Sequence, residues 1–203
     1  MSIETYKQHS ISSNEHDGLK ELEQIIGRPL RSPSQIIHML VDCSGSMEGE
    51  KLEAAKAGAI KFANDAKKQS HSIGLISFDS DAVSRLEPSQ KLEAFEREIK
   101  ALEAKGSTNL AAAIELAFGC LRSSVRTQRV IYIITDGMPN DVAATLAAAD
   151  RAKRAGIQIM TLGTDDADRD FLAKLCSRPE LAIKVPRAQL SDGVASMVKL
   201  LGN

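Results

Sequence analysis

The chain has 203 residues, of which 43% are hydrophobic and 26% are charged, and its formal net charge is −1. This is the composition of an ordinary globular protein, long enough for one domain and an extension. The balanced charge gives no reason to expect nucleic acid or a membrane surface as a partner. No apolar run reaches the ~20 residues that a membrane-spanning helix needs. We therefore expect no nucleic-acid or membrane partner. We also expect a monomer.

Two features of the sequence indicate the cytoplasm. The first twenty residues have neither the basic start nor the apolar core of a secretory signal. Cys43, Cys120 and Cys176 lie in or beside apolar segments and show no CxxC spacing. An odd and sparse set of cysteines is typical of buried, reduced thiols in a cytosolic protein. We predict a cytoplasmic protein in which Cys43 packs as a small core residue.

Residues 1–33 are polar and irregular, and we predict that they form an N-terminal extension to a domain over 34–203. One short amphipathic stretch in the extension predicts a helix that stops at Gly27. Pro29 and Pro33 then prevent the helix from continuing.

From residue 36 onward, predicted strands and helices alternate. The predicted strands are 36–41, 72–78, 82–86, 130–135, 157–162 and 181–185. The predicted helices carry their apolar positions within 52–66, 92–102, 110–121, 142–155, 168–176 and 194–201. The segment 79–81 is too short for a crossover, so 82–86 should return as an antiparallel edge strand. The pattern predicts a doubly wound, Rossmann-like α/β fold with a mostly parallel sheet and helices on both faces.

Oxygen-bearing side chains follow the predicted strands, at the sheet edge where such folds bind ligands. Asp42, Ser44 and Ser46 follow the first strand, and Asp136 follows the strand at 130–135. Thr108 lies in a glycine-led loop that can reach the same edge. A donor set made only of oxygen suits Mg²⁺, and also Mn²⁺ or Ca²⁺, and disfavours Zn²⁺. We predict a metal site formed by these five residues.

The donors at this site predict an open coordination position. The hydroxyls are neutral, and two carboxylates at most balance a divalent cation. A helix that begins near Gly49 would add to the attraction of an anion. The cation should therefore attract an anionic oxygen from outside.

These motifs resemble the metal-ion-dependent adhesion site (MIDAS) of von Willebrand factor A domains of the intracellular bacterial type. The resemblance rests on Asp42-x-Ser44-x-Ser46-Met47, on Thr108 and on Asp136-Gly137, and it covers roughly residues 35–203. It implies a sheet in the order 3-2-1-4-5-6. It also implies that Ser44 and Ser46 are direct ligands, that Thr108 is direct or water-mediated, and that Asp42 and Asp136 act through water or hydrogen bonds.

The function implied by the resemblance is Mg²⁺-dependent protein binding, in which a partner donates a Glu or Asp carboxylate to the metal. Domains of this kind work beside AAA+ ATPases, or with kinases and phosphatases of stress and defence systems, by family analogy. We expect no enzymatic activity. Two alternatives stay open: a phosphohydrolase of the haloacid dehalogenase type, and a metal site that serves only stability. Against the first, Ser44 occupies the position of that family's second acid.

Three other features have simpler interpretations. Lys51 lies beside acids on a predicted helix, so we expect it on a solvated face. His38 lies within a buried strand, and we predict a core residue with hydrogen-bonded nitrogens and no ligand role. The acidic run 165–170 fails the EF-hand pattern, and we expect it to begin a short helix.

Overall fold

A computed structural model describes residues 34–123, 128–164 and 166–201. The predicted N-terminal extension and its helix lie outside the described residues, so the division at residue 33 stays a prediction. The strands are β1 Gln35–Asp42, β2 Ser72–Phe78, β3 Ala82–Ser89, β4 Gln128–Thr135, β5 Ile157–Gly163 and β6 Ala182–Lys184. They form one six-stranded sheet in the order β3-β2-β1-β4-β5-β6.

The pairing of the strands confirms the predicted fold class. β1 pairs in parallel with β2 on one side and β4 on the other, and β5 and β6 continue the parallel order. Among the strands of the described residues, only β2 and β3 pair antiparallel, as the short connection between them requires. The edge strand runs further than the predicted 82–86, to Ser89, with two shifts of register along its length.

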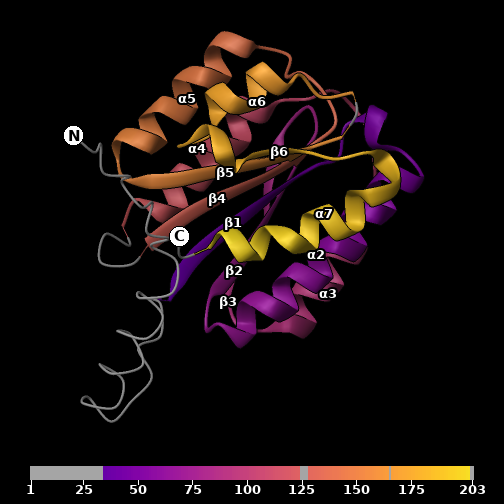
Figure 1. Ribbon diagram of the computed structural model, residues 1–203, viewed down its shortest axis with the longest axis vertical. Coiled ribbons are helices and arrows are strands. Elements are labelled where there is room, and N and C mark those ends of the chain that lie inside the picture. The colour runs from indigo at the N-terminus through magenta and orange to yellow at the C-terminus, as the bar shows by residue number, and fades with distance from the viewer. Residues whose placement is uncertain (1–33, 124–127, 165, 202–203) are drawn as a thin grey trace, which may run out of the picture. The chain divides into compact units, whose positions relative to one another are not determined.

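Helices cover both faces of the sheet (Figure 1). The α-helices are α2 Glu50–Lys68, α3 Leu92–Lys100, α4 Leu110–Leu121, α5 Val142–Arg154, α6 Arg169–Leu175 and α7 Leu190–Ser196. α4, α5 and α6 pack on one face, and α2, α3 and α7 pack on the other. The final helix differs from the prediction of 194–201, since α7 starts at Leu190 and a 3₁₀ turn, Met197–Leu200, follows it.

Small residues let α2 pack closely against both the sheet and the neighbouring helix α7. Ala55 and Ala59 on the sheet-facing side of α2 are 0% exposed, next to the fully buried Phe62. On its other side Gly58 faces Ser191 and Val194 of α7, so closely that a Cβ atom at Gly58 would lie 2.5 Å from the Ser191 carbonyl oxygen. The absence of a side chain at Gly58 therefore sets how near the two helices lie.

The topology brings two strand ends together. β1 and β4 are neighbours in the sheet, yet the chain winds from β1 toward β2 on one side and from β4 toward β5 on the other. Their carboxyl ends, at Asp42 and Thr135, therefore lie at the point where the winding reverses, and loops there diverge to leave room for a ligand. Within the described ranges, no helix is both long and apolar enough to cross a membrane.

Candidate metal centre

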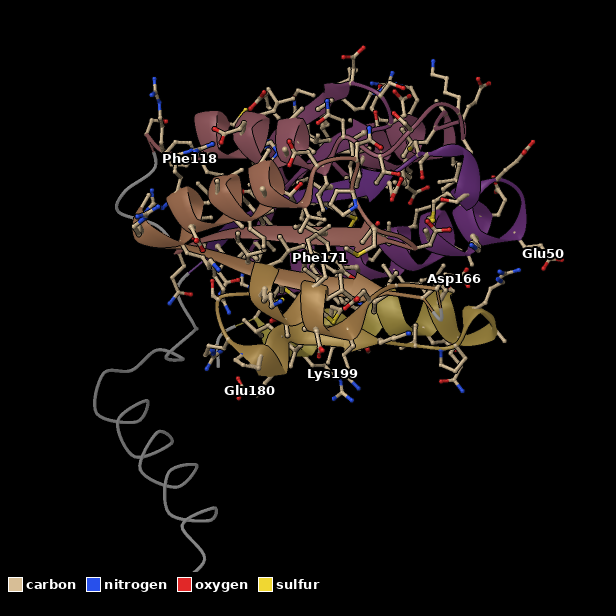
Figure 2. The ribbon with its side chains drawn as sticks, turned by 90° about the horizontal axis from the view of Figure 1, so that it is seen from above. Glu50, Phe118, Asp166, Phe171, Glu180 and Lys199 are labelled. Atoms are coloured by element: carbon tan, nitrogen blue, oxygen red, sulfur yellow. The ribbon has the colours of Figure 1, made fainter. Side chains whose placement is uncertain are left out.

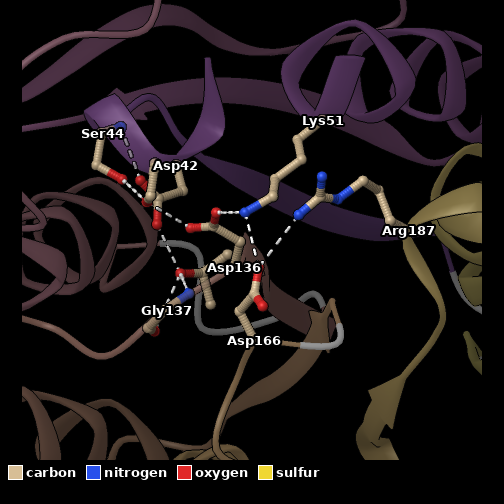
Figure 3. A network of polar contacts seen from close by, with 9 residues as sticks. Asp42, Ser44, Lys51, Asp136, Gly137, Asp166 and Arg187 are labelled. Carbon is tan, nitrogen blue, oxygen red and sulfur yellow. Dashed lines mark hydrogen bonds and ion pairs between the residues drawn. The ribbon is translucent and has the colours of Figure 1, made fainter. Parts of the chain in front are cut away.

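Asp42 ends β1 and is held from two sides. Its side chain is 0% exposed, Oδ1 accepts the backbone N–H of Ser44 at 2.8 Å, and Oδ2 accepts the hydroxyl of Thr135 at 2.6 Å (Figure 3). Burial raises the pKa of Asp42, and the hydrogen bonds from Thr135 and Ser44 partly offset this effect. One carboxylate oxygen therefore fixes the loop that follows β1, and the other joins the end of β1 to the end of β4.

A chain of hydroxyls connects this loop to the end of β4. Ser44 Oγ lies 3.0 Å from Ser46 Oγ, and Ser46 Oγ donates to Asp136 Oδ1 at 2.8 Å. Because Ser46 gives its single hydroxyl proton to Asp136, Ser44 must be the donor in the contact between the two serines. Each serine oxygen then keeps lone pairs that can ligate a cation.

Lys51, in the first turn of α2, belongs to the site, so its prediction as a solvated residue is wrong. It is only 8% exposed, and its Nζ donates to Asp136 Oδ2 at 2.5 Å and to Asp166 Oδ2 at 2.8 Å. Burial alone would lower the pKa of Lys51, but the hydrogen bonds that its ammonium donates to both aspartates outweigh burial and raise the pKa. The ammonium is therefore a fixed positive charge beside Asp136.

The acidic run before α6 has two separate roles. Asp168 caps α6 by accepting the backbone N–H of Phe171, as the prediction of a helix start requires. Asp166 instead extends the polar network, because it accepts Lys51 and lies 3.5 Å from a guanidinium nitrogen of Arg187 (Figure 3). Lys51 holds the pKa of Asp166 below its usual range, with a smaller contribution from Arg187.

The loop that carries Thr108 lies against both of the other loops. The backbone N–H of Gly45 donates to the carbonyl of Gly106 at 3.1 Å. Thr108 exchanges two hydrogen bonds with Asn140 beyond β4, one from its N–H to Asn140 Oδ1 and one from the Asn140 N–H to its carbonyl. Gly106 has φ +68°, and a Cβ there would lie 2.6 Å from Ser80 Oγ, so this position requires glycine.

The structure thus joins four of the five predicted residues, Asp42, Ser44, Ser46 and Asp136, in one hydrogen-bonded network. It brings Thr108 to the same edge through its backbone. Sequence reasoning missed Thr135 and Lys51. The place of Thr135 at the very end of β4, next to Asp136, was a usable signal, whereas nothing in the sequence pattern pointed to the pairing of Lys51 with residues 85 and 115 positions away.

Cys43 packs below this network, as predicted. It is 2% exposed, and its Sγ faces the carbonyl of Val41. Burial raises the pKa of the Cys43 thiol to about 12, with help from the nearby charges of Asp42 and Asp79. The thiol is therefore protonated at neutral pH and unreactive.

The fold is an open α/β sheet, and hydroxyls and carboxylates gather where its winding reverses. This arrangement is typical of α/β domains that bind a ligand at the carboxyl ends of their strands. The profile of the von Willebrand factor type A (VWA) domain matches residues 37–195, and the chain belongs to this family. VWA domains mediate protein interactions, and some of them hold a divalent metal ion at a MIDAS.

The chain is similar to parts of two larger proteins of different kinds, a matrilin and a magnesium-chelatase subunit. The chain is 30% identical over 172 residues to matrilin-4 of Mus musculus, and 31% identical over 163 residues to the magnesium-chelatase 67 kDa subunit of Chlorobaculum parvum. Each match covers 78% of this chain, but only 27% of the matrilin and 23% of the chelatase subunit. The chain therefore spans about a quarter of the length of these relatives.

Solved structures show the same fold at low identity. The VWA domain of the pilus tip protein Mfa5 from Porphyromonas gingivalis has a TM-score of 0.74 and 13% identity, covering 84% of this chain and 95% of that one. Proximal thread matrix protein 1 of the mussel byssus, with zinc in its MIDAS motif, has a TM-score of 0.73 and 16% identity, covering 83% and 46%.

Proposed function

We propose that the chain is a protein-interaction domain whose binding depends on a divalent cation, Mg²⁺ in the first place. The observation that carries the proposal is the convergence of Ser44, Ser46 and Asp136 in one hydrogen-bonded chain, anchored beside the buried carboxylate of Asp42. A partner protein would supply a Glu or Asp carboxylate to the bound cation.

The residues present fit such a cation. Ser44 and Ser46 would hold it through the hydroxyl oxygens whose lone pairs remain available, and Thr108 would complete the set from the adjoining loop. Asp42 and Asp136 would act through water or hydrogen bonds, since the oxygens of each carboxylate already accept hydrogen bonds. When bound, the ion supplies a Lewis-acidic position for an outside carboxylate, and oxygen ligands of this kind favour Mg²⁺ or Mn²⁺.

Lys51 strengthens the argument for an acidic partner. Asp42 and Asp136 carry two negative charges, and the ammonium of Lys51 cancels one of them. A divalent cation at this place would exceed the remaining charge of these three groups, so the site would keep a net attraction for an anion. A carboxylate from a partner meets this need and also fits the open edge of the sheet.

The same geometry argues against the phosphohydrolase alternative. A nucleophilic aspartate has to be reached by its substrate, but the side chain of Asp42 is fully buried and held in place by hydrogen bonds to both of its oxygens. We propose a domain that binds and does not catalyse. We further propose that it works in the cytoplasm as a monomer, over residues 34–203, beside an AAA+ ATPase or a kinase–phosphatase system.

Partner capture tests the proposed function. In a pulldown from lysate read by mass spectrometry, we expect proteins that are retained with Mg²⁺ and are lost with EDTA or in Ser44→Ala, because the hydroxyl ligand is gone. The matched control is Ser123→Ala, at an exposed position just beyond the end of α4, which should capture the same proteins as the unchanged chain. Capture that persists in both EDTA and Ser44→Ala would contradict the proposal.

Thermal melting of Asp42→Asn distinguishes the contribution of the Asp42 carboxylate to metal binding from its contribution to stability. Burial raises the pKa of Asp42, so the folded state loses stability as the pH rises above about 3.8 and the carboxylate ionises. A neutral amide avoids this loss while still accepting from Ser44 and donating to Thr135. In EDTA at neutral pH, Asp42→Asn should therefore melt at or above the temperature of the unchanged chain.

Added Mg²⁺ should then stabilise only the unchanged chain, by about 3 kcal/mol at a concentration 100 times the dissociation constant. An equal rise of the melting temperature in Asp42→Asn would show that Asp42 takes no part in holding the ion.

A further inference from the structure

A second group of potential metal ligands lies away from the candidate metal centre. His38 of β1, Glu87 of β3 and Cys120 of α4 each offer one ligand atom, and these atoms all lie within 4.8 Å of one another. The group combines an imidazole, a carboxylate and a thiol. It therefore differs in chemistry from the oxygen donors of the candidate metal centre.

His38 gives the strongest evidence for a ligand at this group. The prediction that its ring nitrogens are hydrogen-bonded is wrong. The residue is 0% exposed, and neither Nδ1 nor Nε2 has a hydrogen-bond partner in the described part of the chain. Buried polar groups without a partner are rare and costly. Burial also lowers the pKa of His38 to about 4, against the opposing effect of Glu87, so the imidazole is neutral and able to ligate at neutral pH.

The sheet makes room for this imidazole. A Cβ atom at Gly74, on the neighbouring strand β2, would lie 2.8 Å from His38 Cε1 and 2.8 Å from the carbonyl oxygen of Leu86. Glycine at this position therefore lets the ring of His38 lie across β2 toward the edge strand β3.

The edge strand turns its carboxylate to the same place. Ile73 pairs with Ser89 but Leu75 pairs with Leu86, so β3 contains one extra residue in the stretch that holds Glu87. Such bulges redirect side chains. Glu87 Oε1 accepts from Ser84 Oγ at 3.3 Å and lies 4.0 Å from Cys120 Sγ.

Cys120 completes the group from the helix that covers this face of the sheet. It is a free thiol, partly exposed, which leaves a route for an ion from solvent. The labelled Phe118, near the same end of α4, lies at the opposite end of the described domain from Asp166 of the first network (Figure 2). The two groups of ligands are therefore separate sites.

We propose that His38, Glu87 and Cys120 bind a zinc ion through one imidazole nitrogen, one carboxylate oxygen and the thiolate. Zinc accepts this mixture of ligands in a tetrahedron, and a water molecule fills the fourth position. The ligands of a tetrahedral zinc ion are separated by roughly 3.3–3.8 Å. The three ligand atoms lie within 4.8 Å of one another, so they have to approach by about 1 Å at most. The thiol gives up its proton to solvent as the zinc–sulfur bond forms. The ion would fasten the edge strand β3 to β1 and α4.

Cobalt(II), which replaces zinc and gives a thiolate charge-transfer band in the near ultraviolet, tests the site. The full chain carrying Ser44→Ala is used as background, so that the result does not depend on the first site. We expect one Co²⁺ or Zn²⁺ per chain and a thiolate band. Cys120→Ser should abolish the band, and Glu87→Gln should weaken metal binding. The matched control is Cys43→Ala, which removes the thiol nearest to the first site and should leave the band unchanged.

Cys120 is partly exposed, so serine at this position should leave the metal-free melting temperature close to that of the background. Any loss of metal binding in Cys120→Ser is then due to the missing thiolate and not to lost stability. Zinc should raise the melting temperature of the background and of Cys43→Ala, but not of Cys120→Ser. A background protein without a thiolate band, or a band that survives Cys120→Ser, would overturn the assignment. If Cys120→Ser fails to fold, undiminished metal binding by Glu87→Gln would overturn it instead.

Discussion

A chain in which alanine replaces Asp136 is expected to lose metal-dependent partner binding and to unfold at a lower temperature even in EDTA. Asp136 is 1% exposed and accepts both Ser46 and Lys51. Without it, the one partner that the ammonium of Lys51 keeps among the described residues is Asp166, whose side chain is 56% exposed. Leaving a buried charge poorly paired costs several kcal/mol at most sites, and we expect about 1–3 kcal/mol here because Asp166 and solvent compensate in part.

A double-mutant cycle with Lys51→Met distinguishes the two effects. In EDTA, the chain with both substitutions should be more stable than Asp136→Ala, because no unpaired charge remains buried. It should still fail to bind metal or partner, because the carboxylate is missing. Denaturant unfolding and metal-dependent pulldown measure the two properties separately. Recovery of partner binding in the double variant would show that Asp136 serves only as the counter-charge of Lys51.

Gly58→Ala is the substitution expected to lower stability most by packing alone. A Cβ atom at this position would lie 2.5 Å from the Ser191 carbonyl oxygen and 2.6 Å from Val194 Cβ. The first of these is backbone, so α7 has to move away from α2 as a unit. Overpacking of this kind costs about 1–3 kcal/mol and occasionally more. We expect a loss of about 3 kcal/mol in the free energy of unfolding, measured by denaturant titration.

Gly119→Ala, in α4, is the matched control. A Cβ atom at Gly119 meets nothing within 4 Å. The same chemical change should therefore stabilise the chain, by about 0.5–1 kcal/mol, through the higher helix propensity of alanine. Equal effects of the two substitutions, in either direction, would contradict the packing of α7 on α2 described above.

Most of the fold could be predicted because its signals are local. Short apolar runs indicated the parallel strands of the described sheet, amphipathic stretches indicated the helices, and the short connection at 79–81 indicated the antiparallel edge strand. The bulges of β3 and the 3₁₀ turn after α7 were not predictable in this way. They depend on how the edge strand and the last helix fit against elements distant in sequence, and no local pattern encodes that fit.

The sequence by itself determined which side chains follow strand ends, and so it pointed to Asp42, Ser44, Ser46 and Asp136 as a group. That inference needs only the rule that parallel strands end at one edge of the sheet. Only the tertiary structure decided the net charge of the candidate metal centre, and only it showed that the buried nitrogens of His38 lack hydrogen-bond partners among the described residues. Lys51 looks like a surface residue until the first turn of α2 meets the end of β4, where burial makes its pairing with Asp136 favourable. His38 looks like an ordinary core residue until Gly74, the bulge at Glu87 and Cys120 of α4 meet around it. Both outcomes depend on contacts across the sheet and its covering helices, and such contacts exist only once the chain has folded.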